Sequence, residues 1–211
     1  MAEPTDFIDL PRVLLALGLL GVFLVRIPNA VRDYSIGAAA KFRRPLDRLV
    51  VFVLMPLFSI VVPFTWIFSS ALAFADYARP DWLMLPGVAL ILGSLALLWR
   101  SHADLGRNYC GRLEIIKDAE LVTHGVYRLA RHPMYLSVYV FAVGQALLVP
   151  NWIGGPSMLV SSLLIHAVRV PREEAMMEDY YGDAWRAYRE RSNRYWPFSS
   201  RRTSRASQPD R

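Results

Sequence analysis

The sequence predicts an all-α integral membrane protein with about five transmembrane helices and a helical C-terminal tail on the cytoplasmic side. Three observations support this class. The chain of 211 residues is 54% hydrophobic, and its mean hydropathy is positive. Its charged residues are bunched between long uncharged runs, whereas a soluble domain of this length intersperses them. None of the apolar runs shows the water-facing stripe of a surface helix in a soluble protein.

The apolar runs approach the length that a bilayer requires, because a hydrocarbon core of roughly 30 Å is crossed by about 20 helical residues. We expect spans at Leu10–Ile27, Leu49–Phe74, Trp82–Trp99, Met134–Val149 and Trp152–Val168. The first and fourth are short, and the second is long enough to tilt or to kink at Pro56 and Pro63. The residues before the first run are acidic, so we do not expect a cleaved signal peptide, which needs a basic leader.

The basic residues indicate the orientation. Of the 24 lysines and arginines, 22 lie in residues 26–48, in residues 100–132 or in the tail from residue 169 onward. Only Arg12 and Arg79 fall elsewhere. Because cytoplasmic loops of membrane proteins carry the excess of basic residues, we expect the N-terminus outside and the C-terminus in the cytoplasm. Residues 125–133 then lie at the cytoplasmic surface.

We interpret residues 1–198 as one membrane-embedded domain and residues 199–211, rich in serine and arginine, as a disordered basic tail. The polar residues are concentrated in the loop "LGRNYCGRLEIIKDAELVTHGVYRLARHP" and the tail "RVPREEAMMEDYYGDAWRAYRERSNRYWPF". The single cysteine, Cys110, excludes a disulfide within one chain. No histidine or cysteine pair has zinc-ligand spacing, and no glycine-rich nucleotide motif follows a strand, so no metal is expected. No nucleic-acid partner is expected either.

In the loop, Pro133 is well placed in the first turn of the fourth span, where its missing N–H costs nothing. The N–H groups just after it are free, and together with the helix dipole they favour an anion or a polar cofactor group. Arg131 and His132 stand immediately before that helix. The alternative is that Arg128 and Arg131 only anchor the loop at the membrane surface.

In the tail, Pro171 begins another helix after Arg169. We expect the chain to bend there, because the proline ring disfavours helical geometry at Val170. The bend would leave Arg169 at the membrane surface and turn Glu173 back over the loop, so that the two face different partners. Glu173 and its neighbour Glu174 serve either as ligand groups or as ordinary helix-start acids. An apolar-aromatic stripe that would pack on the loop or on the membrane follows at Met177, Tyr181, Trp185 and Tyr188.

Two blocks of these segments carry a family resemblance. The first block comprises Leu121, Val122, Thr123, Gly125, Tyr127, Arg131, His132, Pro133 and Tyr135. The second comprises Arg169, Glu173, Glu174, Tyr181, Gly182, Tyr188, Arg191, Arg194 and Pro197. In this order, separated by one helical hairpin, they resemble the isoprenylcysteine carboxyl methyltransferase family, which is related to phospholipid methyltransferases. The resemblance covers about residues 105–197, and it departs at Ser137, where relatives often have glycine.

The resemblance implies S-adenosylmethionine as methyl donor, bound at the cytoplasmic face by the loop and the tail. Carried over by position, the cofactor-binding residues are Glu120, Leu121, Val122, Tyr127, His132, Pro133, Met134, Tyr135, Glu173 and Glu174. Arg169 and Glu173 take the catalytic roles, and Arg169 also binds the methyl acceptor. If that acceptor is a carboxylate, it is ionised at neutral pH and needs no base.

The acceptor implied by the family is a prenylated cysteine, whose lipid chain would enter from the bilayer between the spans. A phospholipid amine or a small apolar thiol would use the same donor site, so the sequence leaves the acceptor open, as it does the oligomeric state. A non-catalytic membrane subunit or a transporter is a further alternative, but no span carries a charged residue in its middle. Some membrane sterol reductases share a similar C-terminal pattern, yet they are larger than this chain.

Overall fold

The computed structural model describes residues 10–35, 49–110, 115 and 119–195, and these residues form a helical bundle without an extended strand. The α-helices are α1 (Leu10–Ser35), α3 (Val62–Phe68), α4 (Met84–Leu105), α5 (Pro133–Leu148), α6 (Ser157–Val168), α7 (Val170–Tyr181) and α8 (Asp183–Arg191). Short 3₁₀ turns lie at Ala73–Ala75, Asp81–Leu83, Gly106–Asn108 and Gly125–Arg128.

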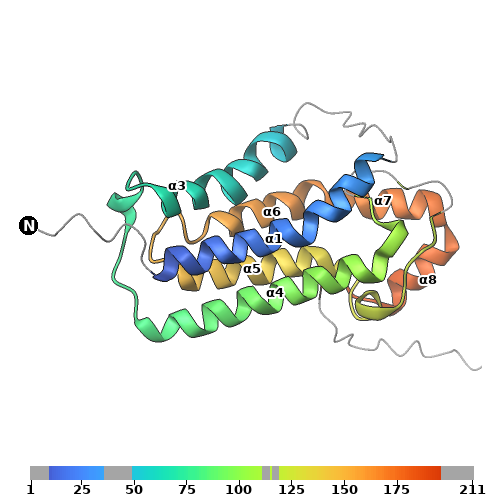
Figure 1. The fold of residues 1–211 in the computed structure, drawn as a ribbon. Helices are drawn as coiled ribbons and strands as arrows, with labels where there is room; N and C mark the ends of the chain where they lie inside the picture. The colour runs from blue at the N-terminus through green and yellow to red at the C-terminus, as the bar shows by residue number, and fades with distance from the viewer. Residues whose placement is uncertain (1–9, 36–48, 111–114, 116–118, 196–211) are drawn as a thin grey trace, which may run out of the picture.

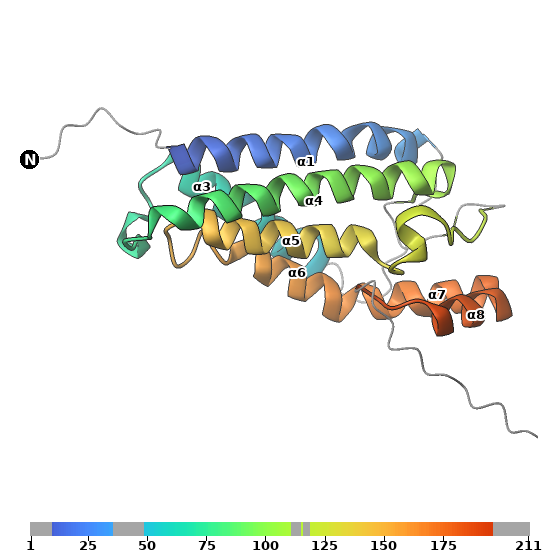
Figure 2. The ribbon, with the colours of Figure 1, turned by 90° about the horizontal axis from the view of Figure 1, so that it is seen from below.

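The bundle is elongated, and its two ends differ. Helices α1, α4, α5 and α6 run side by side, with α4 packed along α5 (Figures 1 and 2). Helices α7 and α8 extend beyond one end, next to the C-terminal end of α4 and the start of α5 (Figure 2). Helix α1 begins at the opposite end (Figure 1). The loop and the tail that carry the polar residues therefore meet at one end of the bundle.

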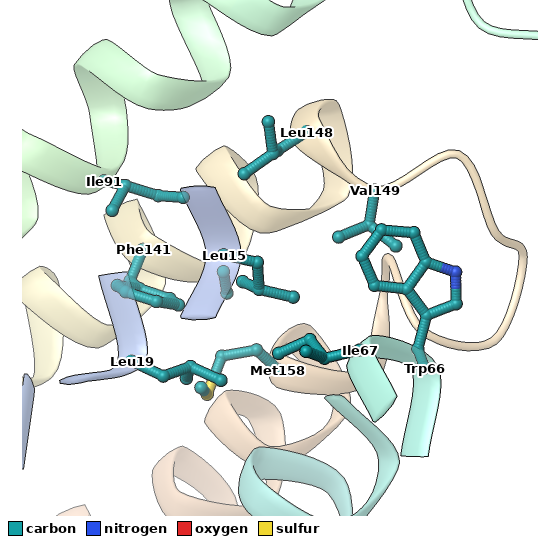
Figure 3. Close-up of a cluster of buried hydrophobic side chains, with 10 residues drawn as sticks. Leu15, Leu19, Trp66, Ile67, Ile91, Phe141, Leu148, Val149 and Met158 are labelled. Carbon is teal, nitrogen blue, oxygen red and sulfur yellow. The ribbon is translucent and has the colours of Figure 1, made fainter. Parts of the chain in front are cut away.

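The core lies between the helices and is filled by apolar side chains from α1, α3, α4, α5 and α6 (Figure 3). Its members are Leu15, Leu19, Trp66, Ile67, Ile91, Phe141, Ala142, Leu148, Val149 and Met158. Leu15, Ala142 and Leu148 have no exposed surface. Each fully buried leucine contributes roughly 1.5–3 kcal/mol relative to an exposed one.

Large apolar side chains also cover the outside of the bundle. Leu24 of α1 is 64% exposed, Leu85 of α4 is 77% exposed and Leu163 of α6 is 61% exposed. A soluble monomer rarely exposes so many large apolar side chains, so this exterior suits a lipid environment. Two helices, Leu10–Asn29 and Asp81–Asn108, are long and apolar enough to cross a membrane. The helical class is thus confirmed, whereas the number of spans stays a prediction.

The second apolar run ends earlier than the sequence indicates. Its helix stops at Phe68, not at Phe74, because Ser69 is extended and its hydroxyl donates to the carbonyl of Thr65 at 2.7 Å. Before that, the helix widens into π-helical turns at Val50–Leu54 and Leu57–Val61. Each turn precedes one of the two prolines, Pro56 and Pro63, whose missing N–H breaks the regular ladder. A tilt or kink at these prolines stays a prediction.

The helix of the fifth apolar run is also shorter than expected, because it begins at Ser157 and not at Trp152. The intervening residues form a tight turn around the fully buried Asn151. The Asn151 side chain accepts from the backbone N–H of Gly154 at 2.7 Å and donates to the Asp76 carboxylate at 2.7 Å. This connection ties together two loops at the end of the bundle opposite to α7.

At the first run, helix α1 continues past Ile27 to Ser35, because the hydropathy criterion marks a membrane boundary and not a helix end.

The crossing of α4 and α5 depends on two glycines that face each other. A Cβ atom added at Gly144 would lie 2.8 Å from the carbonyl oxygen of Gly87 and 2.9 Å from a side-chain carbon of Ile91. Such overpacking typically costs about 1–3 kcal/mol. We therefore expect Gly144→Ala to lower the thermal unfolding midpoint of the detergent-solubilised protein.

Gly93 on α4 is the matched control for this substitution. A Cβ atom at Gly93 meets no heavy atom within 4 Å, and alanine favours the helix more than glycine does. Gly93→Ala should leave the midpoint unchanged or raise it. Equal midpoints for the two variants would show that the close approach of α4 and α5 is not what requires glycine.

Candidate active site

A cavity opens where the loop before α5 meets the tail helices. It is lined by residues of α4, of the loop after it, of the first turns of α5, and of α7 and α8. The cavity contains about 1230 Å³ of empty space, including the part that is open to the outside. Its lining combines apolar and aromatic side chains with a few polar groups, which is typical of small-molecule sites.

The structure brings nearly all of the predicted site residues to this one cavity. The predicted residues that line it are Glu120, Leu121, Val122, Tyr127, His132, Pro133, Met134, Tyr135, Arg169 and Glu173. They come from segments about 40 residues apart in the sequence. Glu174 is the exception, because it turns away from the cavity and lies behind His132. The roles assigned to these residues stay predictions.

The loop segment is shaped by Gly125 and Asp104. Gly125 has a φ of +58°, and a Cβ atom there would lie 2.0 Å from a carboxylate oxygen of Asp104. The same carboxylate accepts a hydrogen bond from the backbone N–H of Val126 at 2.8 Å. Only glycine fits both requirements, since other residues rarely adopt a positive φ. This turn starts the 3₁₀ segment that presents the buried Tyr127 to the cavity.

The first turn of α5 faces the cavity with unsatisfied backbone groups. Pro133 occupies the first turn, as expected, and the N–H of Leu136 bonds to the carbonyl of His132 at 3.0 Å. The N–H groups of Met134 and Tyr135 therefore have no acceptor within the helix. Together with the helix dipole, they create a partial positive charge beside the cavity.

The chain after α8 holds this loop in place. The N–H of Arg131 bonds to the carbonyl of Asn193 at 2.8 Å, and the N–H of His132 bonds to the carbonyl of Arg194 at 2.9 Å. The Tyr188 hydroxyl donates to the Tyr127 carbonyl at 2.6 Å. Burial raises the pKa of Tyr188 to about 12, so this phenol stays a neutral donor at physiological pH. The tail is therefore part of the site and not an appendage.

Glu174 is the buried centre of a charge cluster behind the cavity, in which the Arg194 side chain is 44% exposed. Its carboxylate accepts from Arg194 at 2.5 Å, from Arg131 at 3.3 Å and lies 3.2 Å from His132 Nε2. The Arg131 guanidinium also donates to the carbonyls of Arg189 and Ser192. Burial alone would raise the pKa of Glu174, but hydrogen bonds from His132 and Arg194 outweigh it and hold the pKa well below its usual range. The carboxylate is thus ionised at neutral pH.

Arg169, Glu173 and Tyr135 form a second group, and this group lies inside the cavity. The Tyr135 hydroxyl donates to Glu173 Oε2 at 2.5 Å, and Arg169 Nε lies 4.0 Å from the same oxygen. The prediction that Val170 leaves helical geometry is wrong, because α7 begins at Val170 and tolerates Pro171 in its first turn. The regular helix is interrupted only at Arg169. Arg169 and Glu173 contact each other, and both contact Tyr135.

Several lining residues were not expected from the sequence. Arg26 of α1 and Met55 of the second helix reach the cavity from the first part of the chain. Arg26 counted only toward the orientation, and nothing in its local sequence distinguishes it from other basic residues at helix ends. The stripe along the tail gave a clearer signal: its members line the cavity, and the Tyr181 hydroxyl donates to the Ala119 carbonyl of the loop at 3.1 Å. The expected packing of this stripe on the loop is confirmed.

Comparisons with known proteins agree with this arrangement. Residues 82–184 match the phospholipid methyltransferase family. The protein-S-isoprenylcysteine O-methyltransferase of Schizosaccharomyces pombe is 35% identical over 78 residues, which are 36% of this chain and 32% of that protein. Protein-S-isoprenylcysteine O-methyltransferase A of Arabidopsis thaliana is 28% identical over 124 residues, 58% of this chain and 63% of that protein. The matches thus cover between 32% and 63% of the length of these relatives.

The fold is similar to a solved membrane enzyme. The structure of the eukaryotic intramembrane Ras methyltransferase, isoprenylcysteine carboxyl methyltransferase, superposes with a TM-score of 0.52 at 22% sequence identity. The match covers 85% of this chain and 60% of that one. At this identity the likeness concerns the fold alone. Because it covers 85% of the chain, it extends beyond the two sequence blocks to the N-terminal helices.

Proposed function

We propose that this chain transfers a methyl group from S-adenosylmethionine to the carboxylate of an isoprenylcysteine-like lipid, because residues 82–184 match the phospholipid methyltransferase family and similar proteins are protein-S-isoprenylcysteine O-methyltransferases. One observation carries the proposal: the two sequence blocks, one before α5 and one in α7 and α8, line a single cavity at one end of an apolar bundle. A structural role for the two blocks would not require their polar side chains to face one open space.

The residues of the cavity fit the chemical groups of the proposed donor. The free N–H groups at the start of α5 suit its carboxylate. Glu173, whose side chain is 24% exposed in the cavity, suits its amino group or ribose hydroxyls. Leu121, Val122 and Trp185 supply an apolar wall for the adenine. When bound, the donor supplies an electrophilic methyl group on a sulfonium.

The chain itself has to position the acceptor and exclude water. A carboxylate acceptor is ionised at neutral pH, since an α-carboxyl has a pKa of roughly 3.5, so no general base is needed. Arg169 can hold such a carboxylate in line with the methyl group, and the planar guanidinium fixes its direction. Glu173 and Tyr135 hold Arg169 in turn, because the Glu173 carboxylate lies within 4.0 Å of Arg169 Nε. The apolar lining keeps water from the reacting atoms.

The lipid chain of the acceptor is proposed to enter from the bilayer. Met55, Val138 and Ile165 line the cavity on the side of the bundle, and they belong to three different helices with apolar exteriors. We place this end of the bundle at the cytoplasmic membrane face, with the N-terminus outside and the C-terminus inside, because 22 of the 24 basic residues then lie in the cytoplasm. A reporter fused after Arg211 that is active only outside the cytoplasm would reject this topology.

The proposed function is tested with labelled S-adenosylmethionine and a panel of acceptors. The full-length protein should methylate a prenylcysteine analogue, and it should prefer this analogue to phosphatidylethanolamine and to a small apolar thiol. An analogue that lacks the prenyl chain should react much more slowly below saturation. Transfer to the phospholipid or thiol alone would move the assignment to that acceptor, and transfer to none would remove the enzymatic proposal.

A further inference from the structure

His132 has one of its two ring nitrogens committed to a group outside the cavity. Its side chain lines the cavity and is only 4% exposed, while its Nε2 lies 3.2 Å from Glu174 Oε1. From the sequence, Glu174 and His132 were both expected to bind the donor. The structure separates them, because His132 lines the cavity, whereas Glu174 lies behind it and contacts the lining residues His132 and Arg131.

The state of Glu174 determines which nitrogen carries the proton. Arg131 and Arg194 both donate to this carboxylate, and their charges keep it ionised. An ionised carboxylate only accepts hydrogen bonds, so the facing Nε2 has to be the donor. In the neutral ring with its proton on Nε2, the lone pair is on Nδ1, the ring nitrogen that does not face Glu174.

We propose that Glu174 is a positioning residue that fixes His132 in the Nε2–H tautomer, so that Nδ1 accepts a hydrogen bond from the bound methyl donor. This inference rests on the proposed function, since it concerns the same cavity. The donor groups that Nδ1 could accept from are an amino group of the amino-acid portion or a hydroxyl or amino group of the adenosine. The clamp on Glu174 by Arg131 and Arg194 explains why the tautomer is fixed before the ligand arrives.

Substitutions at His132 separate this role from simple packing. The amide of asparagine reaches the position of Nδ1, whereas the amide of glutamine reaches the position of Nε2. His132→Asn therefore keeps a polar group toward the cavity and loses the bond to Glu174. His132→Gln keeps a donor for Glu174 and loses the acceptor in the cavity. Variants of Glu174 itself are less informative, because they leave buried charges unpaired.

The two variants are expected to rank in opposite order in two measurements on the full-length detergent-solubilised protein, ligand affinity and thermal stability. Calorimetry with S-adenosylhomocysteine should show His132→Gln weakened by about ten- to a hundredfold, and His132→Asn weakened less. Thermal unfolding should show the opposite order, with His132→Gln the more stable variant. A merely structural role of His132 gives the same order in both measurements, and that outcome, or equal losses of affinity, would overturn the proposal.

A second ligand and a spectrum complete the test. 5′-Methylthioadenosine lacks the amino-acid portion. If His132→Gln loses as much affinity for it as for S-adenosylhomocysteine, the hydrogen bond to Nδ1 comes from the adenosine. If His132→Gln loses no affinity for it, the bond comes from the amino group. In the ¹⁵N spectrum of histidine-labelled protein, Nδ1 of His132 should resonate as an unprotonated ring nitrogen, and a protonated Nδ1 would overturn the proposal. His124 is exposed and does not line the cavity, so His124→Gln is the control and should change none of these values. If no acceptor of the panel is methylated but the two His132 variants still rank in opposite order in affinity and stability, the proposed reaction is rejected and the proposed tautomer is not.

Discussion

Replacement of Arg169 by alanine is expected to lower kcat/KM for the acceptor by about ten- to a hundredfold, the value of one charge-assisted contact. The reason is that a carboxylate acceptor loses its clamp, while the donor keeps the start of α5 and the apolar wall. Arg169→Lys should recover only part of the loss, because an ammonium cannot reproduce the planar fork. The measurement is the initial rate with a prenylcysteine analogue, together with calorimetry of donor binding.

The contact between Arg169 and Glu173 changes one part of this expectation. From the sequence alone, donor binding should stay intact in Arg169→Ala, because the two residues were to face different partners. In the structure Tyr135 donates to Glu173 at 2.5 Å, and Arg169 lies on the same carboxylate oxygen. A modest loss of donor affinity is therefore expected alongside the larger loss in kcat/KM.

Arg186 is the matched control for Arg169. It is exposed on α8, it pairs with Glu178 and Asp183, and it does not line the cavity. Arg186→Ala should leave both the rate and donor binding unchanged. If Arg169→Ala abolishes donor binding and leaves the choice of acceptor unaltered, Arg169 belongs to the donor site or to the fold, and the assigned acceptor role is wrong.

The fold class was accessible from the sequence because it depends on local and periodic signals, and the convergence of the two blocks at one site was implied by the family resemblance. Pro133 marks the start of a helix wherever the rest of the chain lies, since its geometry favours the first turn. The tail stripe follows the helical period, so its residues had to share a face. The ends of the second and fifth runs were not accessible. They depend on Ser69 and on Asn151, whose partner Asp76 is 75 residues away in the sequence.

The different tasks of Glu173 and Glu174 show why the site was only partly predictable. Neighbouring residues on an α-helix point about 100° apart, so one of the two acids had to face away from whatever the other contacts. Which one does so depends on the rotation of α7, and that is set by tertiary contacts such as the bond from Tyr181 to Ala119. A motif shows that both acids occur, but not that one lines the cavity and the other lies behind it.

Replacement of Glu174 by alanine is expected to have the largest effect on stability. It leaves the buried Arg131 guanidinium, whose side chain is 9% exposed, with carbonyl partners only. Removing one partner of a buried ion pair typically costs about 3–5 kcal/mol, and we expect about 3 kcal/mol because those carbonyls remain. Thermal unfolding of the solubilised protein measures the loss.

The loss of folding stability at low pH should also depend on the Glu174 carboxylate. Because the pKa of Glu174 is lower in the folded protein than its ordinary value of 4.5, the group stabilises the fold fully above that value. This contribution disappears as the pH falls further toward the folded pKa. Glu174→Gln cannot ionise, so its stability should fall less steeply than that of the unaltered protein when the pH is lowered below about 4.5.

Glu178 provides the comparison that makes the prediction specific. It lies one helical turn further along α7 and also contacts two arginines, Arg186 at 3.1 Å and Arg189 at 2.9 Å, but at the exposed surface. Ion pairs at the surface are screened by water and contribute little, so Glu178→Ala should leave the unfolding midpoint nearly unchanged. Equal losses in Glu174→Ala and Glu178→Ala would mean that the burial of the Glu174 cluster does not decide its value. The cluster behind His132 would then be an ordinary surface network, unable to hold the ring in one tautomer.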